Sequence, residues 1–140
     1  VLDTAPVLLW GDSRIGNIIY APGGTPLAVL DWEMATFGQA EEDLAWYVYL
    51  DRHHSEGMEV SSLEGFPPQE ETIARYEELL GRPMLDMGYY EVLSGFKFTV
   101  IMSRIAQAMI EWGLLDADSD FPRNNNASRL LDVILEGLPS

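Results

Sequence analysis

The feature that most constrains the fold of this 140-residue chain is a turn sequence near its start. Residues 21–26 read Ala-Pro-Gly-Gly-Thr-Pro and separate two short runs of β-forming residues. Because Gly and Pro supply the backbone angles of tight turns, this pattern predicts a β-hairpin over about residues 17–31. Another apolar run, at 6–10, precedes the hairpin and ends at Gly11. We therefore expect strands and loops in the first quarter of the chain.

Beyond the hairpin the chain has the residue spacing of helices. Apolar side chains recur every three or four positions over 41–53, and a second helix over 68–81 opens on Pro and closes on Gly. Asp86 is placed to cap a long helix over 86–112, whose apolar residues on nearly every face predict burial at the centre of the molecule. A last amphipathic helix is predicted over 127–138. The predicted class is α+β, predominantly α-helical.

Composition excludes several classes of partner. With 23 Asp and Glu against 8 Lys and Arg, the net charge of −15 repels nucleic acid phosphates, so no nucleic acid partner is expected. No segment approaches the roughly 18 consecutive apolar residues of a membrane span, so no membrane partner is expected either. The chain has no Cys, which excludes disulfides and favours a cytoplasmic protein. A hydrophobic share of 47% is enough for one core, and a single domain over residues 1–140 is predicted.

The chemically informative residues surround the predicted hairpin. Asp12 and Asn17 have the Asp-x-x-x-x-Asn spacing of a kinase catalytic loop, in which the Asp accepts a hydroxyl proton and the Asn holds magnesium. A hairpin brings its two ends to about 5 Å of each other, so Asn17 and Asp31 can converge on one cation. Mg²⁺ prefers oxygen ligands and keeps several waters, so these two side chains with two nucleotide phosphates would suffice. The sequence therefore predicts a site for a hard cation.

These motifs resemble the aminoglycoside phosphotransferase (APH) family of the protein-kinase-like fold. The family carries a His-Gly-Asp-x-x-x-x-Asn loop followed by an Ile/Leu-Asp-Trp/Phe-Glu motif, which residues 11–17 and 30–33 match. A Gly and then an Asp-Leu-Ala helix start follow in the family, and Gly38 and residues 43–45 match them. The resemblance implies that Asp43 braces the loop. It covers essentially the whole chain, but only the helical C-terminal lobe of the family's fold.

The resemblance also implies a role for each site residue. Asp12 would be the catalytic base, and Asn17 and Asp31 would bind magnesium and the nucleotide. Glu33 would be a further metal contact. Arg14 lies inside the loop, where it could meet a phosphate oxygen during catalysis or pair with Glu33. The implied cofactors are Mg²⁺ and ATP, or another nucleoside triphosphate.

Two departures from the family pattern bear on these roles. The family's His before Gly-Asp is Trp10 here, so the supporting hydrogen bond of that His has to be replaced by packing or by the indole N–H. A complete member also has an N-terminal lobe with a phosphate-covering loop and a Lys held by a Glu. We expect that missing lobe, from the same protein, to be a partner, and this chain alone to hold half a nucleotide site and to be inactive.

The expected function is an ATP-dependent phosphotransferase that moves the γ-phosphoryl group to a hydroxyl of a small-molecule acceptor. One alternative is a degenerate kinase-like binding module without phosphoryl transfer, which Trp10 and the missing lobe favour. Another is a purely structural acidic helical domain, in which Asp12, Asn17 and Asp31 would point apart. The position of these three side chains in the structure therefore bears on the choice between the alternatives.

Two further groups of residues have open interpretations. His53 and His54 lie at the end of a predicted helix, where cations interact favourably with the helix dipole. The many acidic residues form a solvated surface, whose negative field would also concentrate cationic acceptors such as amino sugars or choline. The sequence assigns no acceptor.

Overall fold

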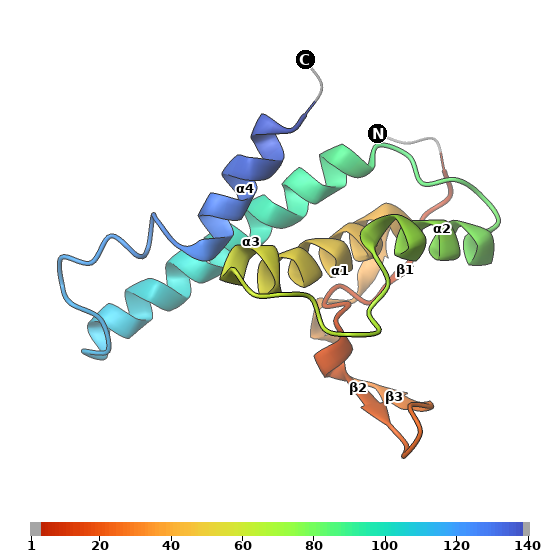
Figure 1. Ribbon diagram of the computed structural model, residues 1–140, viewed down its shortest axis with the longest axis horizontal. Coiled ribbons are helices and arrows are strands. Elements are labelled where there is room, and N and C mark those ends of the chain that lie inside the picture. The colour runs from red at the N-terminus through yellow and green to blue at the C-terminus, as the bar shows by residue number, and fades with distance from the viewer. Residues whose placement is uncertain (1–3, 139–140) are drawn as a thin grey trace.

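The computed structural model describes residues 4–138 and has the predicted α+β class (Figure 1). Four short strands precede four α-helices, and three 3-10 turns connect them. The elements, in chain order, are β1 (Val7–Leu9), η1 (Ile15–Asn17), β2 (Ile18–Tyr20), β3 (Pro26–Val29), η2 (Trp32–Met34), β4 (Thr36–Gly38), α1 (Ala40–His54), η3 (Glu56–Met58), α2 (Gln69–Leu80), α3 (Met87–Glu111) and α4 (Asn126–Glu136).

The predicted hairpin is confirmed. β2 and β3 pair antiparallel, with Ile18 opposite Val29, and they project from the helical body (Figure 1). The Leu30 amide continues the ladder by donating to the Asn17 carbonyl at 2.8 Å. The hairpin therefore places the residue that follows Leu30 beside Asn17.

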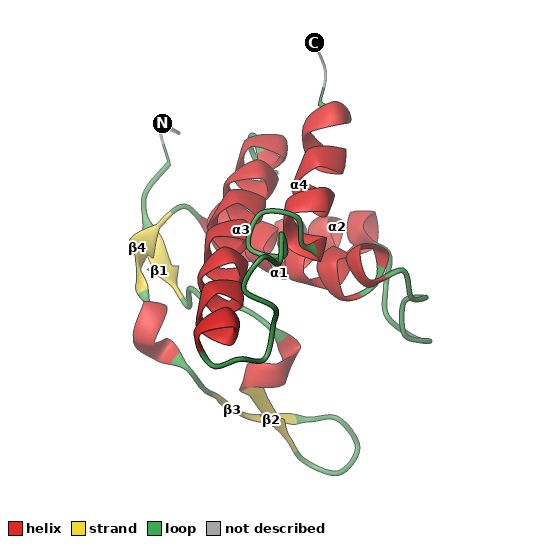
Figure 2. Cartoon of the chain, turned by 90° about the vertical axis from the view of Figure 1, so that its left-hand side faces the viewer, coloured by secondary structure: helices red, strands yellow, loops and turns green. Residues whose placement is uncertain are grey.

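A second strand pair was not predicted. β1 pairs antiparallel with β4, with Leu9 opposite Thr36, and Figure 2 shows this pair as a separate small sheet beside the helices. Gly38 permits the close approach, because a Cβ there would lie 2.7 Å from the Leu9 Cδ1. β4 has only three residues, too few for an alternating pattern to be visible in the sequence.

The helix ends agree with the sequence within a few residues. Gly81 closes α2 in the left-handed conformation, with φ 75°. Asn125 caps α4, since its side chain accepts from the backbone N–H of Ala127 and Ser128. The prediction for Asp86 is wrong in one respect: it precedes α3, but with φ 52° its backbone is left-handed and its side chain makes no capping hydrogen bond. A capping side chain normally needs an extended backbone at that position.

The prediction that the long helix is buried at the centre is also wrong. α3 packs against α1 and α4, but Phe96 and Trp112 are 57% and 73% exposed. The physical reason is partial coverage: α1 and α4 pack against only part of the surface of α3, and with 15 and 11 residues against 25 they are also shorter than α3 (Figure 1). The core is centred on α1 instead. Its buried residues are Trp46, Tyr49, Leu50, Leu130 and Ile134.

His53 belongs to this core, which corrects its interpretation as a cation. Its side chain is buried, with the Phe98 ring centroid 4.8 Å away and the Tyr49 ring stacked on it. Burial, and then the nearby His54, lowers the pKa of His53 to about 4, so the ring is neutral at physiological pH. His54 stays exposed, and its Nδ1 lies 2.7 Å from the Leu50 carbonyl oxygen. In residues 4–138 no helix combines the length and apolarity that crossing a membrane requires.

Candidate functional site

The loop of residues 11–17, called here the Asp12 loop, is anchored to the first turn of α1. The backbone N–H groups of Trp10 and Gly11 donate to the two oxygens of the Asp43 carboxylate, at 2.6 and 2.8 Å. The Ser13 hydroxyl donates to the Asp43 carbonyl oxygen at 2.6 Å. The helix N-terminus itself favours an anion at this position. The brace expected from Asp43 is thus confirmed in its geometry.

Gly11 is required where the loop turns. Its φ is +90°, and a Cβ at this position would lie 2.4 Å from the Met34 carbonyl oxygen. Other residues rarely adopt this conformation. The tight turn carries the chain from β1 into the Asp12 loop and brings it against η2.

Three donors converge on the Asp12 carboxylate. The Trp46 indole Nε1 donates to Oδ1 at 3.0 Å, while the Asn17 amide and the Arg14 Nε donate to Oδ2 at 2.7 and 2.9 Å. Burial acts to raise the pKa of Asp12, but the hydrogen bonds from Trp46, Arg14 and Asn17, with the charge of Arg14, outweigh it and lower the pKa. Asp12 is therefore an oriented, ionised carboxylate at neutral pH.

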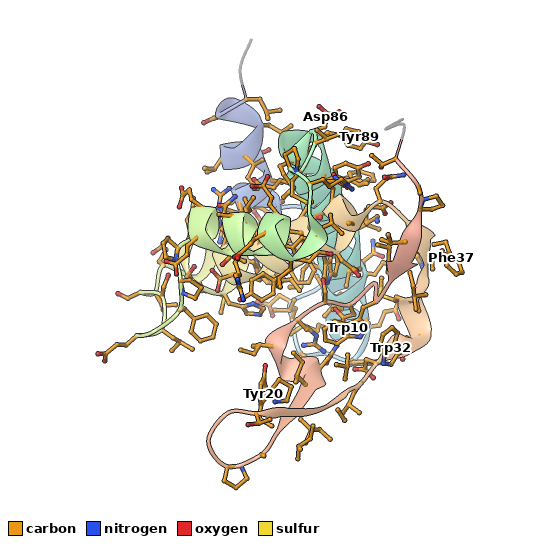
Figure 3. All side chains as sticks on the ribbon, turned by 90° about the vertical axis from the view of Figure 1, so that its right-hand side faces the viewer. Trp10, Tyr20, Trp32, Phe37, Asp86 and Tyr89 are labelled. Atoms are coloured by element: carbon orange, nitrogen blue, oxygen red, sulfur yellow. The ribbon has the colours of Figure 1, made fainter. Side chains whose placement is uncertain are left out.

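Trp10 links the Asp12 loop to the hairpin. Its indole Nε1 donates to the Leu30 carbonyl oxygen at 2.7 Å, and its ring lies 6.2 Å from that of Trp32 (Figure 3). The Trp32 indole in turn donates to the Val29 carbonyl oxygen at 2.9 Å. Packing or the indole N–H was expected to replace the hydrogen bond of the family's His. In the structure the Trp10 indole N–H makes a hydrogen bond, and its ring also contacts Trp32.

The predicted site residues divide into two groups. Asp12, Arg14 and Asn17 are in direct contact. Asp31 follows Leu30 at the end of the hairpin, exposed and in the left-handed conformation with φ 56°. Glu33 is exposed in η2, and in the described part of the chain no ion pair joins it to Arg14, which pairs with Asp12 instead.

Two side chains near the end of the hairpin offer oxygen atoms to a cation. Asn17 is buried and donates through its amide nitrogen to Asp12, which leaves its side-chain oxygen as the atom suited to a cation. Asp31 adds a carboxylate that is exposed to solvent. Within residues 4–138 no group of three His, Cys, Asp or Glu side chains could hold a metal. This set fits Mg²⁺ that keeps its waters and shares phosphates, and does not fit a cation enclosed by protein alone.

Sequence reasoning missed Trp46, which donates to Asp12 from α1. A signal was available, because Trp46 lies three residues after Asp43, and positions three apart share one face of a helix. The face that braces the Asp12 loop through Asp43 therefore also presents the Trp46 indole to it.

Comparison with known proteins agrees with this architecture. The family model described as "Phosphotransferase enzyme family" (APH) matches residues 1–81, which include the Asp12 loop, the hairpin and α1. The mouse protein "Acyl-CoA dehydrogenase family member 11" is 33% identical over 143 residues, which is 96% of this chain but 18% of the mouse protein. This chain thus spans less than a fifth of that relative.

A solved structure shows a similar fold. The crystal structure of a candidate aminoglycoside phosphotransferase from Ralstonia eutropha superposes with a TM-score of 0.65 at 24% sequence identity. The match covers 94% of this chain and 40% of the other. Because the family model matches more than half of the residues, and a structure of the same architecture agrees with it, the chain belongs to the APH phosphotransferase enzyme family, with its protein-kinase-like fold.

Proposed function

We propose that this chain carries the catalytic loop of a phosphotransferase that uses ATP and Mg²⁺ to phosphorylate a hydroxyl of a small molecule. The observation that supports the proposal most is the convergence of Trp46, Asn17 and Arg14 on Asp12. An ionised carboxylate has about four acceptor positions. Three donors therefore fix its orientation and leave about one position for a substrate hydroxyl.

In this proposal the chain's own residues act by positioning. Asp12 accepts a hydrogen bond from the acceptor hydroxyl, aims its oxygen at the γ-phosphorus and takes the proton as the new bond forms. A lowered pKa makes Asp12 a weak base, which suits a loose transition state in which the proton leaves late. Asn17 and Asp31 would hold Mg²⁺, which neutralises phosphate charge when bound.

The alternative of a degenerate binding module is favoured by one contact. Arg14 pairs with Asp12 at 2.9 Å, and this pair occupies one of the positions at which the Asp12 carboxylate could accept a hydrogen bond from a substrate hydroxyl. Arg14 is half exposed, so this pair is weakly held and a phosphate can draw the guanidinium away. The structural-domain alternative requires side chains that point apart, whereas Asp12 and Asn17 are hydrogen-bonded.

The test is turnover of the full-length protein with ATP, Mg²⁺ and a panel of hydroxylated small molecules. We expect Asp12→Ala to lower kcat by about a hundredfold or more, the usual contribution of a general base. Asp116→Asn is the matched control, because Asp116 is an exposed acid of a surface loop. Phosphoryl transfer that survives Asp12→Ala would refute the assignment. No transfer to any acceptor, with nucleotide still bound, would favour the degenerate module.

A further inference from the structure

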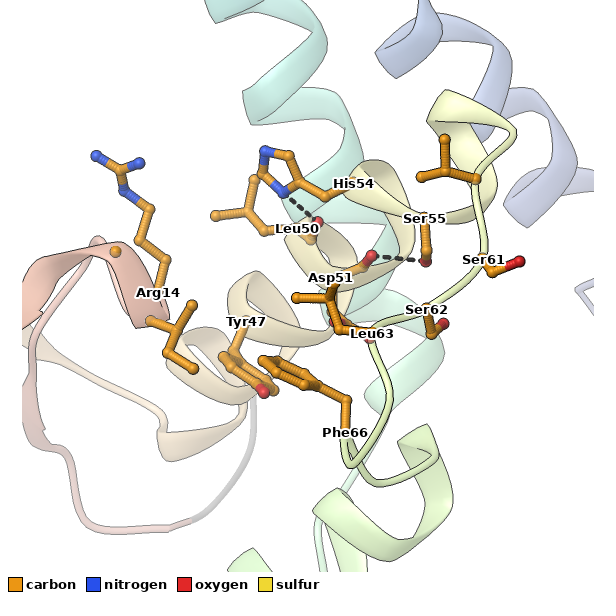
Figure 4. A pocket seen from close by; sticks show the side chains of 13 residues that line it. Arg14, Tyr47, Leu50, Asp51, His54, Ser55, Ser61, Ser62, Leu63 and Phe66 are labelled. Atoms are coloured by element: carbon orange, nitrogen blue, oxygen red, sulfur yellow. Dashed lines mark hydrogen bonds between the residues drawn. The ribbon is translucent and has the colours of Figure 1, made fainter. Parts of the chain in front are cut away.

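A cavity of about 420 Å³ opens directly beside the Asp12 loop (Figure 4). Its walls come from loop residues 14–16, from the second half of α1, and from residues 60–66, which lead to α2. Arg14 lines this cavity and also donates to the Asp12 carboxylate, so the cavity adjoins the proposed base. Its volume lies within the range of small-molecule sites, about 300–1,000 Å³.

The walls are mostly apolar although they face solvent. The apolar side chains around the cavity are Ile15, Tyr47, Leu50, Val60, Leu63 and Phe66. Several remain open to water, with Leu63 70% and Val60 56% exposed. Covering such surface is favourable roughly in proportion to the apolar area removed from water. The cavity therefore favours a ligand with an apolar body.

The charges on the walls do not suit a polycation. Asp51 is the one carboxylate among the side chains that line the cavity, and it is accompanied by the basic groups of Arg14 and His54. An amino sugar carries several ammonium groups, and each needs a partner once water is displaced. The net charge of −15 therefore does not indicate a cationic ligand for this cavity, because most of the acidic residues lie outside its walls.

We propose that this cavity is the acceptor site, and that the acceptor is an alcohol whose hydroxyl is carried on an apolar alkyl or aryl body. This inference rests on the proposed phosphoryl transfer at Asp12. In that step the alcohol oxygen forms a bond to the γ-phosphorus, and the bond from the γ-phosphorus to the bridging oxygen breaks. ADP leaves, and the hydroxyl proton passes to Asp12 and then to water.

Binding without nucleotide tests the site. Isothermal titration calorimetry of the full-length protein would use 4-phenyl-1-butanol as the apolar alcohol and kanamycin as the polycation. We expect 4-phenyl-1-butanol to bind, and Leu63→Ser to raise its Kd about tenfold, as loss of one apolar contact predicts. Leu79→Ser is the matched control, since Leu79 is 72% exposed in α2 and does not line the cavity.

A charge-removing variant separates the two ligand classes. Asp51→Asn tests the polycation, because an amino sugar held in this cavity would depend on its one carboxylate. Failure of 4-phenyl-1-butanol to bind would overturn the inference, as would binding that is insensitive to Leu63→Ser. Kanamycin binding that Asp51→Asn weakens would likewise overturn it.

The calorimetry is done without ATP, so it measures alcohol binding alone. Its result therefore does not depend on whether the protein transfers a phosphoryl group. If Asp12→Ala leaves turnover intact while Leu63→Ser still weakens alcohol binding, the proposed function fails and the apolar-alcohol site stands. If Asp12→Ala abolishes transfer but Leu63→Ser changes neither the Kd of 4-phenyl-1-butanol nor the KM of a turned-over alcohol, the inference fails alone.

Discussion

Because of the buried His53, the free energy of unfolding is expected to decrease in mild acid. Its pKa falls from an ordinary 6.5 to about 4 because its ring is enclosed by the core and lies beside His54. Its Nδ1 is buried without a hydrogen-bond partner in the described structure, so no acceptor compensates a proton there. Between pH 6.5 and 4 the unfolded chain binds this proton and the folded chain does not. Stability is therefore fully present above about pH 6.5 and is lost as the pH falls.

The size of the effect follows from the shift. Each pH unit between the two pKa values costs about 1.4 kcal/mol, so the loss is about 2 kcal/mol at pH 5 and about 3 kcal/mol once pH 4 is reached. Glu91 has the opposite effect on stability as the pH falls. Burial raises its pKa, so the folded state binds a proton there more readily than the unfolded state. The difference between the wild type and a variant without the imidazole isolates the contribution of His53.

The assay is urea unfolding of the full-length protein, followed by Trp fluorescence at pH 7.5, 6 and 5. His53→Phe keeps an aromatic ring against Tyr49 and Phe98 and removes the titrating group. Its stability should match or exceed that of the wild type, with an advantage that grows by about 2 kcal/mol from pH 7.5 to 5. His54→Gln removes only the smaller contribution to the lowered pKa of His53 and should keep most of the pH dependence. Parallel pH profiles for the wild type and His53→Phe would refute the reasoning.

Three further changes test the supports of the Asp12 loop, and a fourth tests the proposed metal site. Asp43→Ala leaves two backbone N–H groups without their acceptor, so it should destabilise the protein by about 3 kcal/mol in urea unfolding and speed exchange of the two amides. Gly11→Ala should be at least as damaging, because the new Cβ meets the Met34 carbonyl at φ +90°; a wild-type unfolding midpoint would contradict this. Trp10→Phe removes the indole donor together with part of the ring that contacts Trp32, and should cost at least about 1 kcal/mol, measured in the same way. Asp31→Ala should abolish Mg²⁺-dependent ATP binding in calorimetry, and retained binding would remove Asp31 from the metal site.

Local sequence signals predicted much of the fold and of the site. The glycines and prolines of the 21–26 turn fix a hairpin because the two strands are neighbours in sequence. The spacing from Asp12 to Asn17 indicated a single catalytic loop, and in the structure these two side chains are hydrogen-bonded to each other. Gly81 was recognisable as a helix end because capping is decided within a single turn.

Contacts between distant segments were not predictable in this way. β4 forms only because β1, some thirty residues earlier, offers it an edge. Apolar residues around the long helix do not reveal how much of it other helices cover, and Phe96 remains exposed for that reason. His53 looked like a surface cation because its sequence position is a helix end, whereas its charge state depends on Phe98 packing across from α3.

The exposure of Asp31 is compatible with a preorganised site, because the backbone that carries it is fixed from two directions. Asp43 holds the Asp12 loop to α1, and the Trp10 indole holds the same stretch to the carbonyl of Leu30, the residue before Asp31. Hydrogen bonds at the residues just before Asp12 and Asp31 therefore restrain where these two aspartates lie, while the Asp31 carboxylate stays exposed to ligands. Phosphoryl transfer depends mainly on such positioning. Trp10 thus stands where the family has His, and its ring N–H links the Asp12 loop to the hairpin.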